Sequence, residues 1–194
     1  MTTDLSHWIE VHASATPDKV ALQFEDTIIS YRELCQQVHG ATRFLRQRLQ
    51  VGPGERIAYL GFNSPEFLVL LFACARLGAM LVPLNWRLEL PELVRVVNHA
   101  GARALIADPA HQQLATALVG QCPTCVLAES EALDQGYSKV DTAVDHKGRI
   151  TSRPITAPDP QAVPTTPVLL VYTSGTTGQP KGVVLTQRAL LFNA

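Results

Sequence analysis

The sequence of 194 residues predicts an α/β fold, in which layered helices cover a largely parallel sheet and a β-hairpin carries a glycine-rich loop. Two observations lead to this prediction. Between residues 30 and 128, segments of helical length alternate with short segments rich in Val, Ile and Leu, which is typical of parallel strands joined by helices. Near the C-terminus, two short apolar segments at 168–171 and 183–185 flank a polar, glycine-rich loop and predict a hairpin.

The first 50 residues are expected to form a helix, a β-hairpin and a longer helix. Apolar side chains at helical spacing predict the first helix, which ends before Pro17. An alternating segment at 20–24, an acidic turn and two isoleucines predict the hairpin. Ser30 and Glu33 have the spacing of a capping box at the start of the second helix. The apolar face of that helix comprises Leu34, Val38, Ala41, Leu45 and Leu49.

Residues 57–128 predict the alternation of strands and helices on which the fold class rests. Ser64 followed by Pro65 is a typical helix start, and Gly78 is expected to end or weaken that helix. Residues 67–77 are apolar at almost every position, so this helix is expected to be buried on all sides. Strands are predicted at 57–60, 104–107 and 125–128, a strand or loop at 81–84, and further helices at 90–100 and 112–119.

Composition and charge argue against several classes of protein. With 46% hydrophobic and 17% charged residues, the chain resembles an ordinary globular protein. Its net charge of −1 gives no basic surplus, so we expect no nucleic-acid partner. The first residues lack the pattern of a signal peptide, and the most apolar stretch, residues 67–75, is too short to cross a bilayer. We therefore expect no transmembrane segment and a cytoplasmic location.

The cysteines are interpreted as structural. Cys35 and Cys74 fall in predicted helices and are expected to be buried apolar residues. Cys122 and Cys125 form a Cys-x-x-Cys pair, but neither a second pair nor histidines follow at the spacing of a zinc site. A redox motif would have a helix after it, whereas a strand is predicted here, so we interpret the pair as coincidental.

Proline density divides the chain into three parts. Residues 151–167 are rich in proline, which disfavours a helix or a central strand and predicts an extended connector. Residues 1–150 are predicted to form an N-terminal α/β subdomain. Residues 168–194 are predicted to form the hairpin and the start of a further subdomain.

The loop in this hairpin has the composition of a polyphosphate-binding site. Glycines let backbone N–H groups approach a ligand closely, and consecutive N–H groups in such a turn form a concave anion site. Hydroxyls add further donors, and Lys181 adds a positive charge. The candidate phosphate-binding residues are Thr173, Ser174, Gly175, Thr176, Thr177, Gly178 and Lys181. A plain glycine-rich turn is the simpler alternative, but it would require neither the hydroxyls nor the lysine.

The loop differs from a Walker A motif and resembles that of another family. Pro180 stands where Walker A has its second glycine, and a strand, not a helix, is predicted after Gly182. The segment Tyr-Thr-Ser-Gly-Thr-Thr-Gly-Gln-Pro-Lys-Gly at 172–182 is similar to the phosphate-binding loop of the adenylate-forming superfamily, which includes acyl-CoA synthetases, peptide-synthetase adenylation domains and luciferases. Pro-Leu-Asn-Trp-Arg-Leu at 83–88 resembles the acyl-CoA synthetases within it.

This resemblance implies the N-terminal portion of the adenylate-forming fold and a ligase reaction in two steps. A carboxylic acid and ATP give an acyl-adenylate and pyrophosphate, and coenzyme A then displaces AMP to form a thioester. The implied cofactors and partners are ATP, Mg²⁺, coenzyme A and a small-molecule carboxylic acid. The loop would hold the β- and γ-phosphates, with Thr173 as the candidate magnesium ligand. No catalytic residue is expected within this segment.

Two departures from the family pattern matter. Gln187 follows Thr186 where the family usually has a histidine that helps shape the acyl site, so the role of this position is open. The family's downstream Tyr-Gly-x-Thr-Glu motif, its ribose-binding aspartate and its C-terminal lysine have no counterpart in these 194 residues. We therefore expect an N-terminal fragment of an acyl-CoA synthetase that is inactive alone.

Two properties of such a fragment are expected. Residues 173–182 should be mobile without ligand, because they carry few apolar side chains. The chain should form a homo-oligomer, through the hairpin or through apolar surface beside residues 67–77. A stand-alone nucleotide- or phosphate-binding module and a non-catalytic interaction domain are the alternative functions.

Overall fold

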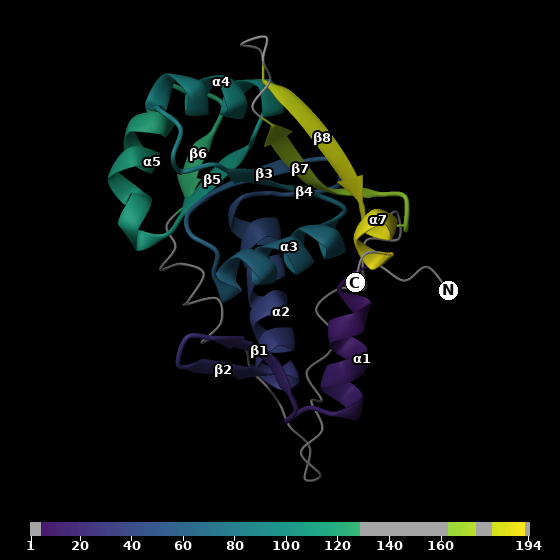
Figure 1. Ribbon diagram of the computed structural model, residues 1–194. Helices are drawn as coiled ribbons and strands as arrows, with labels where there is room; N and C mark the ends of the chain where they lie inside the picture. The colour runs from purple at the N-terminus through teal and green to yellow at the C-terminus, as the bar shows by residue number, and fades with distance from the viewer. Residues whose placement is uncertain (1–4, 129–162, 174–179, 193–194) are drawn as a thin grey trace.

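The computed structural model describes residues 5–128, 163–173 and 180–192. Six strands form one sheet in the order β6-β5-β3-β4-β7-β8 (Figure 1). Its parallel members are β3 (Arg56–Leu60), β4 (Met80–Leu84), β5 (Ala104–Ala107), β6 (Val126–Ala128) and β7 (Pro167–Thr173), and β8 (Lys181–Thr186) runs antiparallel to β7. The predicted N-terminal hairpin forms separately from β1 (Val20–Phe24) and β2 (Thr27–Ser30). The predicted α/β class with a largely parallel sheet is confirmed.

Helices cover both faces of the sheet and create two cores. On one side lie α1 (His7–Ala15), α2 (Tyr31–Arg48) and α3 (Pro65–Leu77), and on the other lie α4 (Leu90–Ala100) and α5 (Gln112–Val119) (Figure 1). Successive residues of a strand point to opposite faces. Ile57 and Tyr59 of β3 therefore enter the first core, whereas Ala58 and Leu60 enter the second. This two-sided burial explains why the parallel strands are apolar throughout.

The long helices α2 and α3 begin where the sequence predicts, because serine oxygens cap their first turns. Ser30 Oγ accepts a hydrogen bond from the Glu33 N–H at 3.3 Å, and the Glu33 carboxylate accepts one from the Ser30 N–H at 2.8 Å. Ser64 Oγ accepts from the Phe67 N–H at 3.4 Å, and proline follows the cap. Gly78 ends α3 with φ of 67°, in the left-handed region that favours glycine.

Helix α3 is buried over most of its surface by other elements of this chain, whereas burial on all sides was predicted. It packs against α2, β4 and β7. Its buried residues are Val69, Leu70, Leu71, Ala73, Cys74, Ala75, Arg76 and Leu77. Full burial of a leucine contributes about 1.5–3 kcal/mol, so α3 is a main source of stability. Phe67 and Phe72 of α3 are only partly buried, so self-association through the apolar surface beside this helix stays a prediction.

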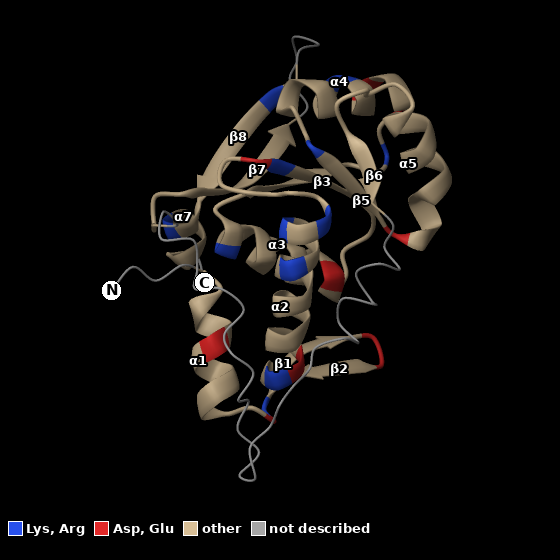
Figure 2. Ribbon diagram, turned by 180° about the vertical axis from the view of Figure 1, so that it is seen from behind, with Lys and Arg blue, Asp and Glu red and all other residues tan. Residues whose placement is uncertain are grey.

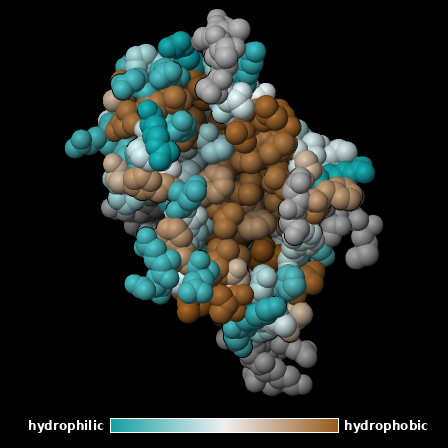
Figure 3. Space-filling model, in the orientation of Figure 1, coloured by the Kyte–Doolittle hydropathy of each residue, from teal (hydrophilic) through white to brown (hydrophobic). Residues whose placement is uncertain are grey.

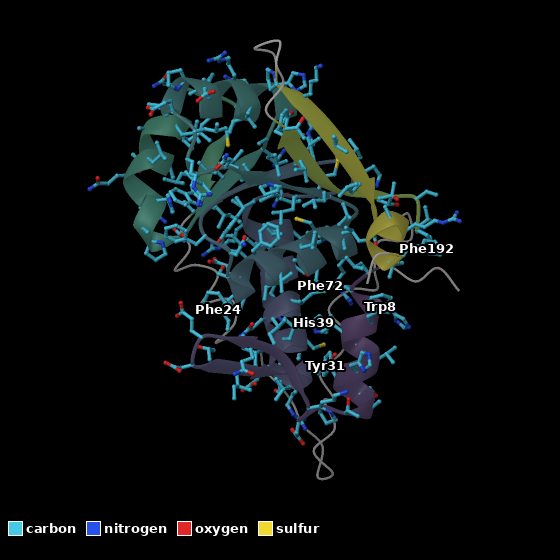
Figure 4. The ribbon with its side chains drawn as sticks, in the orientation of Figure 1. Trp8, Phe24, Tyr31, His39, Phe72 and Phe192 are labelled. Atoms are coloured by element: carbon cyan, nitrogen blue, oxygen red, sulfur yellow. The ribbon has the colours of Figure 1, made fainter. Side chains whose placement is uncertain are left out.

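A buried polar cluster joins α1 to this layer. Arg76 is 2% exposed and donates a hydrogen bond to the Glu10 carboxylate. His39 points from α2 toward α1 and places Nε2 3.2 Å from Glu10 Oε1 (Figure 4). The hydrogen bond with His39, followed by the charge of Arg76, lowers the pKa of Glu10 to about 2 against the opposing effect of burial. Glu10 is thus held as an anion between two nitrogen donors.

The path of β7 determines where the C-terminal hairpin of β7 and β8 lies relative to the rest of the sheet. β7 pairs with β4 at Leu81 and Leu169, and no further register pair follows between them. Pro83, two residues on, has no N–H to donate to a longer ladder. β7 then diverges, and its carboxyl end lies near the C-terminal end of α4 (Figure 1). Both hairpin strands are longer than predicted, and Pro167 takes the first position of β7, where a strand tolerates proline.

Two further expectations concern organisation and charge. The proposed connector at 151–167 lies largely outside the described residues, so the division into subdomains stays a prediction.

Basic and acidic positions are spread over several elements (Figure 2). Among the described residues, none of the helices has the length and apolar character needed to cross a membrane.

Candidate phosphate-binding site

The mouth of the β7–β8 hairpin brings two predicted phosphate-binding residues together. Tyr172 pairs with Gly182, and Thr173 pairs with Lys181 at the end of the ladder. Directly opposed residues of antiparallel strands project on the same face of a sheet, so the Thr173 hydroxyl and the Lys181 ammonium share one face. Both residues are exposed and available to a ligand. The hairpin thus presents a hydroxyl donor and a cation side by side.

The remaining predicted residues lie between these two strand ends. Ser174, Gly175, Thr176, Thr177 and Gly178 fall outside the described residues, and so does most of the segment predicted to be mobile. The structure therefore locates the two ends of the predicted loop. It leaves the proposed contacts of its centre as predictions.

Gly182 has a packing role that the sequence did not reveal. A Cβ atom built at this position would lie 2.8 Å from Leu170 Cδ1 and 3.3 Å from Tyr172 Cζ. A side chain at residue 182 would therefore push against the tyrosine ring across the ladder. The glycine lets Tyr172 lie close to β8, where its hydroxyl reaches His99 of α4 at 2.7 Å from Nδ1.

A second group of residues, which sequence analysis missed, lies where the parallel strands β3, β4 and β5 end. Phe62, Trp86 and His111 follow these strands and contact one another edge to face or tilted, with ring centroids 4.8–5.8 Å apart. The Arg87 guanidinium lies 4.3 Å from the centre of the Trp86 ring. Phe62 is 48% exposed, so this aromatic cluster presents a ring face or edge to solvent. Ligands of open α/β sheets bind at such carboxyl ends, a signal that the sequence already carried.

Asp108 holds this aromatic cluster in place. Its Oδ2 accepts from the Phe62 N–H at 2.9 Å, and its Oδ1 accepts from the His111 N–H at 3.0 Å. The same Oδ1 lies 2.6 Å from His111 Nδ1. A Cβ at residue 61 would lie 2.9 Å from Asp108 Oδ2, so Gly61 permits this close approach. A single carboxylate therefore holds both the backbone of Phe62 and the ring of His111.

One cluster has the residue types of a catalytic triad but the wrong geometry. Cys35 Sγ lies 3.9 Å from His39 Nε2, and the same nitrogen faces Glu10 at 3.2 Å. A relay requires the base to use its two different ring nitrogens for nucleophile and acid. Burial raises the pKa of Cys35 to about 11, which keeps it a thiol. This cluster serves packing.

The other cysteines and Gln187 also have structural surroundings. Cys74, Cys122 and Cys125 are free and buried, and burial raises the pKa of each thiol. Gln187 is fully buried at the start of the helix α7 (Gln187–Leu191). Its Oε1 accepts from the Leu5 N–H at 2.6 Å, and its Nε2 donates to the Ala75 carbonyl at 3.0 Å. At the position where a histidine was expected, the glutamine ties the N-terminal segment to α3.

Comparison with known proteins shows the family to which the chain is similar. Residues 9–194 match the family described as AMP-binding enzyme. The chain is 39% identical over 191 residues to an indoleacetate–CoA ligase of Aromatoleum aromaticum, a match that covers 98% of this chain and 36% of that ligase. It is 36% identical to a feruloyl-CoA synthase of an Amycolatopsis species, covering 97% of this chain and 34% of that protein.

A solved structure extends the agreement to the fold. The inhibitor-bound N-terminal domain of FACL13 from Mycobacterium tuberculosis superposes with a TM-score of 0.78 and 25% identity, covering 96% of this chain and 45% of that chain. The chain spans about a third of the length of the curated relatives described above. The matches cover nearly all of its residues, including both strands of the hairpin, and the chain belongs to the family of AMP-binding enzymes.

Proposed function

We propose that this chain is the N-terminal part of an ATP-dependent acyl-CoA synthetase. The complete enzyme would convert a small carboxylic acid and ATP into an acyl-adenylate and pyrophosphate, and then transfer the acyl group to coenzyme A. The observation that carries this proposal is the hairpin mouth, where Thr173 and Lys181 are paired at the two ends of the glycine-rich segment. The CoA ligases among its relatives support the same reaction class.

The chain's own contribution would be electrostatic. Lys181 would neutralise charge on the β- and γ-phosphates, and the N–H groups of Gly175, Thr176 and Gly178 would donate to phosphate oxygens. With Ser174 and Thr177, they would stabilise the charge that develops on departing pyrophosphate. These roles require neither a nucleophile nor a general base from this part of the enzyme.

The donors at the hairpin mouth fit Mg²⁺ bound to a nucleotide. Mg²⁺ prefers oxygen ligands and is usually bound together with substrate phosphates. Thr173 offers a hydroxyl oxygen, and the residue opposite it is the cation Lys181. The ion would therefore reach Thr173 as part of a complex with ATP. There it would offset phosphate charge.

We further propose that the aromatic cluster of Phe62, Trp86 and His111 contacts a planar ring of a substrate. An exposed aromatic face stacks on planar groups, and the neighbouring Arg87 would attract a phosphate or carboxylate attached to such a ring. Coenzyme A and an aryl acid both combine a ring with such an anionic group. In a Trp8→Phe background, which leaves Trp86 as the remaining tryptophan of the sequence, quenching of fluorescence by one ligand but not the other would identify the source, and Phe62→Ala should weaken the effect.

Two measurements test the proposed function. The chain should bind Mg·ATP and Mg·pyrophosphate in a titration calorimeter, which separates it from a non-catalytic interaction domain. Incubated with ATP, Mg²⁺, coenzyme A and a panel of fatty and aryl acids, the 194-residue chain should form no thioester above background. Thioester formation by the pure chain would contradict its assignment as an incomplete part. A cytoplasmic location and homo-oligomerisation stay predictions.

A further inference from the structure

The contact between His99 and Tyr172 joins two elements that are distant in sequence. His99 Nδ1 lies 2.7 Å from Tyr172 Oη, and the two rings meet edge to face at 87° with centroids 5.7 Å apart. The residues are 73 positions apart, and neither belongs to the aromatic cluster at the ends of β3–β5. Tyr172 directly precedes Thr173, the last residue of β7. The contact therefore acts at the base of the candidate phosphate-binding loop.

The histidine side of this contact is firmly held. His99 belongs to the last turn of α4, which closes with Gly101 at φ of 60° and with hydrogen bonds from Gly101 and Ala102 back to the helix. Arg56, at the start of β3, donates from Nε to the Ala100 carbonyl at 2.7 Å. The helix end is thus fixed to the central strand of the sheet. It is a rigid anchor.

On the tyrosine side, the ring is half-buried against the core beneath α4 and α5, and its hydroxyl forms a hydrogen bond with His99. β7 leaves β4 after one register pair, so toward its carboxyl end the ladder with β8 is the pairing that remains in the described sheet. On β8, the Tyr172 ring lies against Gly182, which has no side chain to pack around it. A hydrogen bond from α4 to the tyrosine hydroxyl therefore fixes the hairpin end relative to the rest of the molecule.

We propose that His99 is a positioning residue for polyphosphate binding, acting through the Tyr172 hydroxyl. The proposal rests on the function proposed above, in which the residues between Thr173 and Lys181 bind the phosphates of ATP. A ligand gains affinity when the groups that contact it are ordered beforehand, because less conformational freedom is lost on binding. By holding Tyr172, His99 orders the strand end from which those groups begin.

The test compares four variants of the 194-residue chain by titration with Mg·pyrophosphate and Mg·ATP. His99→Ala and Tyr172→Phe should each weaken binding about fivefold, as expected from the loss of one net hydrogen bond of ~1 kcal/mol. The double variant should bind no more weakly than either single variant, because both remove the same contact. His99→Asn should restore most of the affinity, since the asparagine side chain places a polar atom near the position of Nδ1.

The control is Asn98→Ala, an exposed neighbour on the same helix, which should bind like the parent chain. Each variant should still unfold cooperatively in urea, with a free energy of unfolding within about 1 kcal/mol of the parent value. If the parent chain binds and His99→Ala binds equally well, or if the two single effects add in full, the positioning role is wrong while the proposed function stands. If the parent chain binds neither ligand at millimolar concentration, the proposed function fails and the inference fails with it.

Discussion

In the helical layer, Arg76 is 2% exposed and is bonded to Glu10, whereas at the hairpin mouth Lys181 and Thr173 are exposed at the end of a two-stranded ladder. The same contrast separates two histidines. His39 lies between helices and bonds to a carboxylate, while His99 lies at the surface and bonds to the tyrosine that begins the loop. Similar side chains thus occupy opposite environments in one small fold.

The contrast between buried and exposed charges indicates which region governs stability and which governs ligand binding. A buried charge is desolvated, so removal of its partner leaves a group that water cannot reach, at a large cost in free energy. An exposed charge is solvated in the absence of ligand and can exchange water for phosphate at little cost to the fold. We therefore expect substitutions in the helical layer to change the free energy of unfolding, and substitutions at the hairpin to change ligand affinity.

The largest expected effect is that of Glu10→Ala. This change leaves the guanidinium of Arg76, which is 2% exposed, without the Glu10 carboxylate and should lower the free energy of unfolding by about 3–5 kcal/mol. The matched control is Asp18→Ala, which breaks the exposed pair with Arg32 at 3.1 Å and should cost at most about 1 kcal/mol. Urea unfolding followed by circular dichroism measures both. Equal losses in the two variants would show that burial does not distinguish the regions.

The pH dependence of stability sharpens the same comparison. Glu10 has a folded pKa of about 2 against an ordinary 4.5, so its ionised form favours the folded state. Its contribution is fully present above pH 4.5 and is lost as the pH falls through 2. With partial exposure of the carboxylate, we expect a loss of at most about 3 kcal/mol. Glu10→Gln should show a smaller loss over this pH range, and a parallel curve would contradict the assignment.

Much of the fold could be predicted because its signals are local. The bounds of α4, β5 and α5 match the predicted ranges, since amphipathic spacing and short apolar segments mark them within a few residues. The capping box at Ser30 and Glu33 is equally local. Strand bounds near the hairpin were less accurate, because the ladder extends as far as its partner strand allows.

Contacts between distant residues could not be predicted in this way. The sequence marks Arg76 as a charge inside an apolar helix, but its partner Glu10 is 66 positions away. Phe62, Trp86 and His111 each follow a strand, yet their meeting depends on the order of strands in the sheet. The same holds for His99, because its contact with Tyr172 depends on the path that β7 takes through the sheet.

At the hairpin, Lys181→Ala should reduce the affinity for Mg·pyrophosphate about ten- to hundredfold. A hydrogen bond to a charged group contributes roughly 1.5–3 kcal/mol, which corresponds to that range. The free energy of unfolding should stay within about 0.5 kcal/mol of the parent value, because the side chain is exposed. Lys19→Ala, a second exposed lysine before β1, is the matched control and should leave binding unchanged. An unchanged affinity for Lys181→Ala would mean that Lys181 is a solvated charge without a binding role.

The smallest effect concerns self-association through β8. Val183 and Val184 are 48% and 50% exposed, and β8 is the last strand in the order of the described sheet. Apolar surface extends along the face on which β8 lies (Figure 3). β7, by contrast, is paired on both sides, so the expectation that both hairpin strands become edges holds for β8 alone. An unpaired apolar edge tends to pair with another chain.

We therefore expect the isolated chain to form a dimer across β8 that buries more than about 1,000 Å². A lysine on an edge strand opposes such pairing, so Val184→Lys should raise the dissociation constant about tenfold. Val126→Lys is the matched control, because Val126 is 52% exposed on β6 at the opposite edge of the sheet. Sedimentation velocity over a concentration series separates the cases. A larger effect of Val126→Lys would indicate that the interface lies at β6 instead of β8. A parent chain that stays monomeric at high concentration would show that the exposed valines of β8 do not by themselves drive association.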